Sequence, residues 1–459
     1  MLSRNFGFRC NIARMSKQNA PIISSHMLKC KVISVISLFA MLCPLVAAAG
    51  PCNLVVYDPS FTEQTSPGIH VPTFVDEVIV GMVEPDVKGY AATLTDRFGR
   101  RVATIQNGLA RTSCDEGGER AFDANSKTPW GSVGKLITTA AVLKAADING
   151  VNLDDPLENY LPHRWRNLLH TRYKYGENGS GPLTLRLLLQ HRGGFRHSSC
   201  GYTARERLVT GDALQCVGDD PNPTPPPPAV GLRSYSNMSL GIFQVALAYM
   251  LFPDYMNIIV EPQANLMDDD SYDDYIQAET NSIYVSYVKT NVLNPISISG
   301  TCNMPEFKAN NPKGNYTLWY SSASDSKGQL PPDQDHTCAA GGWSLTSNEI
   351  AHFLYSLRHT DSVLDREAYG LMEAGFLDSH GWHKSPMDTG LSYYHNGSWG
   401  GTKSNVRSLP GGLLVTIVAN SSSSSTGELL SAIDKAFNSA RRIGLSQSLV
   451  ALQAPGVLN

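Results

Sequence analysis

The chain has 459 residues, of which 42% are hydrophobic and 17% are charged, and its formal net charge is −4. This length and composition allow a large apolar core, so a disordered or fibrous protein is excluded. The first acidic residue is Asp58, so the chain beyond the N-terminal segment is more acidic still. A nucleic-acid partner is not expected, because a phosphate-binding surface needs clustered positive charge.

The N-terminal residues have the features of an export signal. Met27–Lys31 is short and basic, Val32–Val46 is almost wholly apolar, and Ala47–Ala49 supplies the small residues of a cleavage site. We predict a signal or targeting segment over 1–49, in which Met27 could be the true initiator. A transmembrane anchor or a mitochondrial presequence is the alternative. The prediction implies an exported protein, periplasmic or secreted, with membrane contact only through an uncleaved signal segment.

Cysteine usage agrees with export. Beyond the N-terminal segment the number of cysteines is even, which favours disulfides in an oxidising compartment. Proximity along the chain favours the pairs Cys52–Cys114, Cys200–Cys216 and Cys302–Cys338. Free buried cysteines are the alternative.

Several regular elements can be predicted in chain order. Short apolar runs over 89–94 and 102–105, separated by turn residues, predict a β-hairpin. An alanine-rich run over 136–146 predicts a helix that ends near Gly150, and 184–190 predicts a short one. A β-prone run over 413–419 predicts a strand, and apolar residues at helical spacing over 429–437 predict a helix.

Two segments interrupt this pattern. Pro221–Pro228 is too rich in proline for a helix or a central strand, so it is expected to be a surface loop. Residues 252–282 have the character of an insertion. Their aspartates, which include Asp268, Asp269 and Asp273, predict a solvated acidic loop, with calcium binding as an alternative.

The sequence Ser132-Val133-Gly134-Lys135 is a Ser-x-x-Lys motif at the expected start of the first helix. Residues three apart share a helix face, so Lys135 is expected beside the Ser132 hydroxyl. A lysine that is neutral through burial or nearby cations could activate this hydroxyl as a nucleophile. The alternative for Ser132 is a plain helix N-cap.

The segments around this motif resemble the class C β-lactamase-like family of serine hydrolases. Thr128–Ala141 resembles the family's nucleophile segment, and Gly150–Pro162 resembles its Leu-Asp-Asp-Pro segment. Leu183–Gly194 resembles its Leu-Leu-x-His segment before a glycine turn. One departure is Gly134, where relatives more often carry threonine or a similar residue, and a glycine there loosens the helix slightly.

Tyr235-Ser236-Asn237 resembles the family's Tyr-x-Asn motif. The spacing of two is expected to put both side chains on one side of an extended loop. By resemblance, Tyr235 passes a proton between the serine oxygen and the leaving group, and Asn237 hydrogen-bonds the lysine or the substrate carbonyl. The alternative is a turn with a packed tyrosine.

The sequence His395-Asn396-Gly397-Ser398 stands where penicillin-recognising enzymes usually carry Lys-Thr-Gly. His395 takes the lysine position, and Gly397 lets the substrate approach the strand edge. The resemblance implies an oxyanion hole made by the backbone N–H groups of Ser132 and Ser398. A surface-loop histidine is the alternative for His395.

Other candidate residues are weaker. His380 and His383 are spaced as His-x-x-His, but no carboxylate with zinc-site spacing accompanies them, so no metal site is predicted. His191 and His197 flank a glycine turn and are expected to be structural. Gly341-Gly342 resembles the family's glycine-rich segment that lines the active-site wall.

Taken together, the resemblance implies an α+β fold, or α/β sandwich. An antiparallel sheet is flanked by helices and joined by a mainly helical region, with the active site between them. The hydrolase domain is expected over 50–445, with 252–282 as its insertion and 446–459 as a C-terminal tail.

The implied function is that of an exported serine hydrolase, which forms an acyl-enzyme and needs no cofactor. Its small-molecule or peptide substrate is an ester, a D-amino-acid peptide or a β-lactam. The absence of the usual lysine favours an esterase or peptidase over a β-lactamase. A catalytically silent protein of the same fold that binds cell-wall peptides is the alternative.

Overall fold

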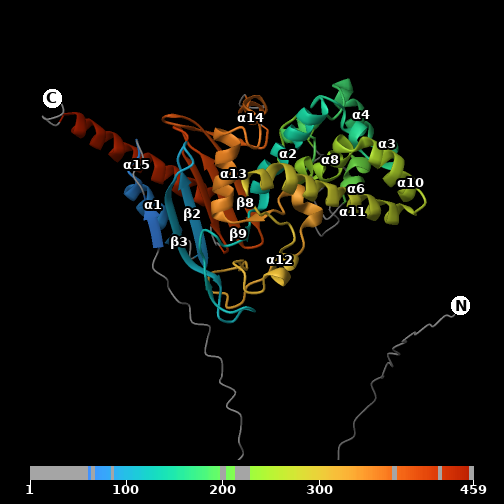
Figure 1. The fold of residues 1–459 in the computed structure, drawn as a ribbon. Coiled ribbons are helices and arrows are strands. Elements are labelled where there is room, and N and C mark those ends of the chain that lie inside the picture. The colour runs from blue at the N-terminus through green and yellow to red at the C-terminus, as the bar shows by residue number, and fades with distance from the viewer. Residues whose placement is uncertain are drawn as a thin grey trace, which may run out of the picture. The chain divides into compact units, whose positions relative to one another are not determined.

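An antiparallel β-sheet forms the centre of the computed structural model (Figure 1). The structure describes residues 60–63, 68–83, 87–196, 203–211, 228–374, 380–421 and 426–453, all within one compact unit. Within these residues seven strands follow the order β1-β3-β2-β10-β9-β8-β7, and the short β4 pairs with β3. The strands are β1 Ser60–Glu63, β2 Gly89–Thr95, β3 Arg101–Arg111, β4 Arg120–Ala121, β7 His383–Met387, β8 Gly390–Trp399, β9 Thr402–Ser408 and β10 Leu414–Ala419. A separate two-stranded pair joins β5 Thr128–Pro129 to β6 Ser344–Leu345.

The central strands are covered on both faces. Every residue of β2 and of β10 is buried, which explains why these strands read as continuous apolar runs and not as alternating ones. The predicted hairpin is confirmed, because β2 pairs with β3 in antiparallel register. The predicted strand over 413–419 is confirmed as β10, which lies between β2 and β9.

Helices cover the two faces of the sheet, as Figure 1 shows. On one face α1 Val71–Val83 packs beside α15 Thr426–Gln453. The apolar core there joins Val78 of α1 and Phe437 of α15 to Ile417 of β10. On the other face α13 Ser347–His359 packs against β2 and β10. The predicted α+β architecture, an antiparallel sheet flanked by helices, is therefore confirmed.

The mainly helical region is built around α2 Gly134–Asn149 and α8 Phe243–Leu251, which are in contact. The first ten residues of α2, from Gly134 to Leu143, are all buried, so the start of this helix is held firmly by its surroundings. The other helices of this part of the chain are α3 His163–Leu168, α4 Thr171–Tyr175, α5 Leu185–Leu189, α6 Ala204–Thr210, α7 Asn237–Gly241, α9 Pro253–Tyr255, α10 Glu261–Ala264, α11 Asp269–Val288, α12 Met304–Asn310 and α14 Arg366–Glu373.

The acidic segment is helical, so the prediction of a solvated acidic loop over 252–282 is wrong. Asp268 is the N-cap of α11, where its side chain accepts a hydrogen bond from the Ser271 N–H. Asp273 accepts a hydrogen bond from Trp165 Nε1 at 2.8 Å. Carboxylates in the first turn of a helix are stabilised by its dipole. Within the described residues, no group of three or more His, Cys, Asp or Glu side chains is placed to hold a metal ion.

One predicted disulfide is present: Cys302 is bonded to Cys338, with their Cα atoms 5.7 Å apart. Cys114 is also disulfide-bonded. The predictions for the segment 1–49, for Cys52, for Cys200 with Cys216, for His197 and for the prolines at 221–227 fall outside the described residues. The domain bounds of 50–445 and 446–459 remain a prediction, although α15 continues beyond 446 to Gln453.

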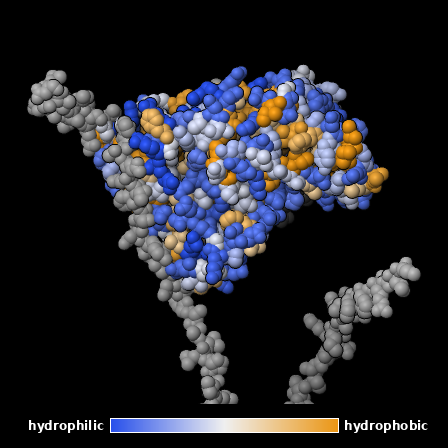
Figure 2. All heavy atoms as spheres, viewed as in Figure 1, coloured by the Kyte–Doolittle hydropathy of each residue, from blue (hydrophilic) through white to orange (hydrophobic). Residues whose placement is uncertain are grey.

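Large apolar side chains are exposed at the far end of the helical region, at Phe252, Ile258 and Leu266. Figure 2 shows apolar atoms there, around the position of α10, while most of this face is hydrophilic. Of the helices the structure describes, none alone is long and apolar enough to cross a membrane. The two helical segments Asn237–Leu251 and Pro253–Ala264, which form a bent pair, reach the length and apolar composition of a membrane span only when taken together. Within this pair, Phe243–Met250 is buried in the core.

Candidate active site

Ser132 lies in a single 3₁₀ turn, η1 Gly131–Val133, and α2 begins directly after it at Gly134. Trp130 and Val133 occupy the two N-cap positions, and neither helix is capped by a side chain. The alternative interpretation of Ser132 as a helix N-cap is therefore wrong. Its hydroxyl instead contacts the side chains of Lys135 and Tyr235.

The side chain of Lys135 is fully buried. The hydrogen-bond partners of its Nζ are all oxygen atoms. It donates to Ser132 Oγ at 3.0 Å and to Asn237 Oδ1 at 2.8 Å, and it also contacts the carbonyl oxygen of Ala340. Burial lowers the pKa of Lys135 from its ordinary value of 10.5 to about 7, because desolvation disfavours the charged amine. The neutral amine, which can accept a proton, is therefore well populated at neutral pH.

Tyr235 contacts the same hydroxyl. Its phenol donates a hydrogen bond to Ser132 Oγ at 2.7 Å, and its ring centroid is 5.2 Å from Lys135 Nζ. Burial raises the pKa of Tyr235 to about 12, although the hydrogen bond to Ser132 acts in the opposite direction. The phenol is thus protonated at neutral pH, so it can give a proton more readily than it can take one.

The local structure around Tyr235 differs from the prediction of one extended loop. Ser236 is the N-cap of α7, its hydroxyl accepts from the Met238 N–H, and Asn237 is the first residue of the helix. Asn237 reaches Lys135 from the start of this helix. The two motif residues still meet at one site, because Tyr235 contacts Ser132 while Asn237 contacts Lys135.

The third motif lies at the end of β8, where that strand meets η1. A Cβ atom on Gly131, whose φ is +54°, would lie 2.7 Å from the backbone nitrogen of Ser398. A Cβ atom on Gly397 would lie 2.0 Å from the carbonyl oxygen of Trp130. Glycine at both positions therefore allows the backbones of η1 and β8 to touch. This contact brings Ser398 beside the turn that carries Ser132.

The glycine-rich segment packs against the same turn. A Cβ atom on Gly341, whose φ is +146°, would lie 2.7 Å from the carbonyl oxygen of Gly131. This segment follows η7 Asp335–Ala340, whose Cys338 is bonded to Cys302. The glycine-rich segment thus supports η1, and Ala340 at the end of η7 supplies one of the oxygens around Lys135.

His395 is buried beside Tyr235, with 6.4 Å between their ring centroids. Its Nδ1 lies 2.7 Å from the carbonyl oxygen of Asn396, and its pKa is well below the ordinary value, first through burial and then through the charges of His383 and Lys135. A neutral imidazole thus occupies the position at which the sequence resemblance led us to expect a lysine.

Two further histidines surround the tyrosine and were not among the predicted site residues. The ring of His191 is 4.6 Å from that of Tyr235, and the ring of His383 is 6.0 Å from it. His383 lies on β7 opposite Tyr394, one residue from His395, which places the rings of the two histidines 5.0 Å apart. Strand pairing brings His383 to the site, whereas loop packing brings His191 there, since the Ser234 N–H donates to the His191 carbonyl oxygen.

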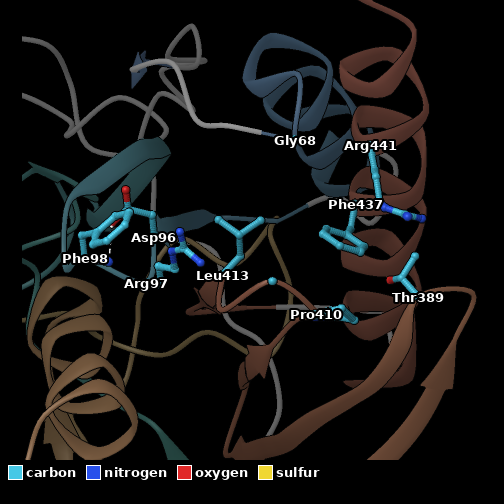
Figure 3. A pocket seen from close by; sticks show the side chains of 10 residues that line it. Gly68, Asp96, Arg97, Phe98, Thr389, Pro410, Leu413, Phe437 and Arg441 are labelled. Carbon is cyan, nitrogen blue, oxygen red and sulfur yellow. Dashed lines mark hydrogen bonds between the residues drawn. The ribbon is translucent and has the colours of Figure 1, made fainter. Parts of the chain in front are cut away.

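A separate cavity of about 420 Å³ lies at the other end of β8, away from Ser398 (Figure 3). Arg97 and Phe98 line it from the β2–β3 turn, Leu413 from the residue before β10, and Phe437 and Arg441 from α15. None of the predicted site residues lines this cavity.

Comparison with known proteins agrees with this arrangement. A family model described as Beta-lactamase matches residues 79–250, a range that contains Ser132, Lys135, Tyr235 and Asn237. The search of curated proteins found no match.

Solved structures share the fold. A class C β-lactamase from Rhodobacter sphaeroides is similar with a TM-score of 0.56 and 16% identity, over 80% of this chain and 98% of that one. A β-lactamase/D-alanine carboxypeptidase from Yersinia pestis, complexed with citrate, is similar with a TM-score of 0.55 and 16% identity, over 80% of this chain and 98% of that one. The structure of SurE with D-Leu is similar with a TM-score of 0.53 and 19% identity, over 80% of this chain and 75% of that one.

Over residues 79–250 the chain is similar to the Beta-lactamase family, and its fold is that of class C β-lactamases and penicillin-binding-protein homologues. The family model supplies the sequence evidence, and the solved structures supply the fold.

Proposed function

We propose that the protein is a serine hydrolase that acts through an acyl-enzyme on Ser132. One observation carries the proposal: the Ser132 hydroxyl oxygen is hydrogen-bonded by both the Lys135 amine and the Tyr235 phenol. A serine hydroxyl is a weak nucleophile until a neighbouring base removes its proton. The buried lysine supplies such a base, and the phenol supplies a proton donor to the same oxygen.

The reaction begins when the neutral Lys135 amine takes the Ser132 proton and Oγ attacks the substrate carbonyl carbon. The tetrahedral intermediate then collapses, the bond to the leaving group breaks, and the leaving group takes a proton through Tyr235. Lys135 returns its proton to Tyr235, and the acyl group remains on Ser132. Water then attacks the acyl-enzyme in the same way, and the free acid leaves.

The contact between η1 and β8 supports an oxyanion hole in this mechanism. The backbone N–H groups of Ser132 and Ser398 belong to two segments whose backbones touch at Gly131. Such donors stabilise the charge that develops on the carbonyl oxygen, because they are already oriented before the reaction. Gly397 and His395 would line the substrate position along the same strand.

For the substrate we propose an ester or a peptide, in preference to a classical β-lactam. His395 is buried and neutral where the usual lysine would carry a fixed charge. A panel of p-nitrophenyl esters, D-Ala-D-Ala peptides and nitrocefin tests this choice. Ester or peptide turnover that exceeds nitrocefin turnover is expected, whereas strong nitrocefin turnover without esterase activity would refute it.

A fluorophosphonate probe tests whether Ser132 reacts at all. The wild-type protein is expected to be labelled, and Ser132→Ala is expected to remain unlabelled with an unchanged circular dichroism spectrum. Equal labelling of both proteins would remove Ser132 from the mechanism. Peptide binding without any acyl-enzyme would favour the silent binding protein instead.

We also propose that the protein is exported and works in an oxidising compartment. The Cys302–Cys338 bond supports this proposal, because disulfides rarely persist in a reducing cytosol. Intact mass spectrometry of the protein from its natural source, with and without reductant, would show the mature start and the number of disulfides. A full-length mass with only free thiols would contradict the proposal.

A further inference from the structure

The cavity beyond the N-terminal end of β8 has the composition of a small-molecule site (Figure 3). Leu413 and Phe437, whose side chains are buried, contribute apolar surface to it, and Arg97 and Arg441 contribute guanidinium groups. Small-molecule sites typically have volumes of about 300–1,000 Å³ and combine apolar walls with a few polar groups that orient the ligand. The volume of this cavity, about 420 Å³, lies in that range.

The two cations of this cavity have no acidic partner. Among the described residues, no carboxylate lies within ion-pair distance of Arg97 or Arg441. Asp96 also lines the cavity, but its carboxylate is taken by Arg100, which it contacts at 2.8 Å. The guanidinium of Arg97 lies over the ring of Phe98, 4.8 Å from the ring centroid, and this contact favours one position for it. The cavity therefore carries positive charge that no ion pair among the described residues neutralises.

The arrangement of the four side chains points to a ligand with two charged ends. In Figure 3 the side chains of Leu413 and Phe437 lie between those of Arg97 and Arg441. The two arginines belong to different elements, since Arg97 follows β2 and Arg441 lies on α15. An apolar chain with an anionic group at each end would place one anion at each guanidinium and its middle against the apolar pair. Carboxylates suit this arrangement, because a guanidinium binds them through two parallel hydrogen bonds.

A hydroxyl group in the same cavity also lacks a partner. Thr389 lies in the turn between β7 and β8, and its Oγ1 is buried without a hydrogen-bond partner among the described residues. Buried polar atoms are nearly always hydrogen-bonded in folded proteins, so this oxygen indicates a ligand group at this position. A threonine hydroxyl can donate to a carboxylate oxygen, as the guanidinium groups do. The three groups are therefore donors for the same kind of ligand.

We propose that this cavity binds a dicarboxylate, with one carboxylate held by Arg97, the other by Arg441, and the apolar chain packed on Leu413 and Phe437. Thr389 donates a hydrogen bond to one of the carboxylates. The site is separate from the candidate active site, because neither side chain that contacts the Ser132 hydroxyl lines the cavity. The proposal therefore goes beyond the proposed function and does not depend on it.

Calorimetry with paired acids tests the proposal. Adipate, suberate and sebacate cover a range of lengths, and hexanoate, octanoate and decanoate have the same lengths with a single carboxylate. The best of the dicarboxylates is expected to bind the wild-type protein about 10-fold or more tightly than the monocarboxylate of the same length, as for one additional charge-assisted hydrogen-bonded pair. Absence of dicarboxylate binding, or equal Kd values within every pair, would overturn the proposal.

Substitutions locate the site. Arg97→Gln and Arg441→Gln are each expected to raise the Kd of the best dicarboxylate to that of the monocarboxylate, and Thr389→Val to raise it about 2- to 10-fold. Arg101→Gln is the matched control, because Arg101 is an exposed arginine at the start of β3 that does not line the cavity. This variant removes the same charge and is expected to keep the wild-type Kd. Equal losses in Arg101→Gln and Arg97→Gln would indicate general charge attraction and overturn the proposal.

Ser132→Ala separates this proposal from the proposed function. The variant is expected to bind the dicarboxylate with the wild-type Kd, because the cavity lies at the end of β8 away from Ser398 and the turn that carries Ser132. Loss of binding in Ser132→Ala would place the ligand in the active site and overturn the proposal. Failure of the proposed function would appear differently, as absence of an acyl adduct on Ser132 while the dicarboxylate still binds through Arg97 and Arg441.

Discussion

The amine of Lys135, on the first turn of a helix whose first ten residues are all buried, lies 3.0 Å from the hydroxyl oxygen of Ser132. The same amine is held by Asn237 and by the carbonyl of Ala340, which come from two other parts of the chain. The position of the base is therefore fixed by tertiary contacts, while its spacing from the serine is fixed by the 3₁₀ turn that leads directly into the helix.

The burial of Lys135 predicts how activity depends on pH. The active form of the base is the neutral amine, and the pKa of Lys135 is about 7. Below this pH the amine is protonated, so kcat/KM should fall as the pH decreases through 7 and level off above it. A pH–rate profile between pH 5 and 9 measures this, and a flat profile through pH 6–8 would contradict the role of Lys135 as the base.

Tyr235→Phe removes the hydroxyl that donates to Ser132 and keeps the ring that packs against His191. We expect kcat/KM to fall by about 10²–10⁴-fold, the usual contribution of a general acid, while the melting temperature changes little. Steady-state kinetics and thermal unfolding check the two parts. Full activity in this variant would show that the leaving group takes its proton from another source.

Gly397→Ala tests the contact between β8 and η1. The new Cβ would lie 2.0 Å from the carbonyl oxygen of Trp130, a backbone atom that cannot move aside cheaply. We expect destabilisation by about 1–3 kcal/mol from overpacking, together with loss of activity as Ser398 moves away from Ser132. Denaturant unfolding and ester hydrolysis measure the two effects.

Gly370→Ala is the control for this substitution. Gly370 lies within α14, and a Cβ atom there would meet nothing within 4 Å. Alanine is expected to stabilise the helix by about 0.5–1 kcal/mol and to leave activity unchanged. Similar stability and similar activity of the Gly397→Ala and Gly370→Ala variants would refute the importance of the β8–η1 contact.

The Cys302–Cys338 bond closes a segment with a sequence separation of 36. Replacing both cysteines, as Cys302→Ala with Cys338→Ala, should cost about 2–4 kcal/mol of unfolding free energy. Activity should also fall, because Cys338 belongs to the turn whose Ala340 carbonyl contacts Lys135. Urea unfolding with an unaltered midpoint in the double variant would show that this bond is dispensable.

Much of the fold could be predicted from local patterns in the sequence. The hairpin β2–β3, the helix α2 and the strand β10 follow from apolar runs and turn residues. The acidic segment misled the prediction, because its aspartates alternate with residues such as Tyr272 and Ile276 whose burial in α11 depends on packing. An acidic run can form a helix when its N-terminal carboxylates cap it and its apolar side chains find a core.

The site residues, too, could be predicted from the sequence only in part. The spacing of Ser132 and Lys135 follows from helix geometry, and Asn237 meets Lys135 as its motif suggested. His383 carried no such signal, because its contact with Arg233 joins residues 150 positions apart. Strand pairing and loop packing create that contact, and neither can be read from residue spacing in one chain.

The most direct test of the account is to locate the acyl group. The protein would be mixed with a slowly hydrolysed ester or a fluorophosphonate and digested, and the modified peptide sequenced by mass spectrometry. The account predicts a single adduct on Ser132 that forms much more slowly in Lys135→Met and not at all in Ser132→Ala. An adduct on another residue, or one that forms equally fast without the Lys135 amine, would contradict it.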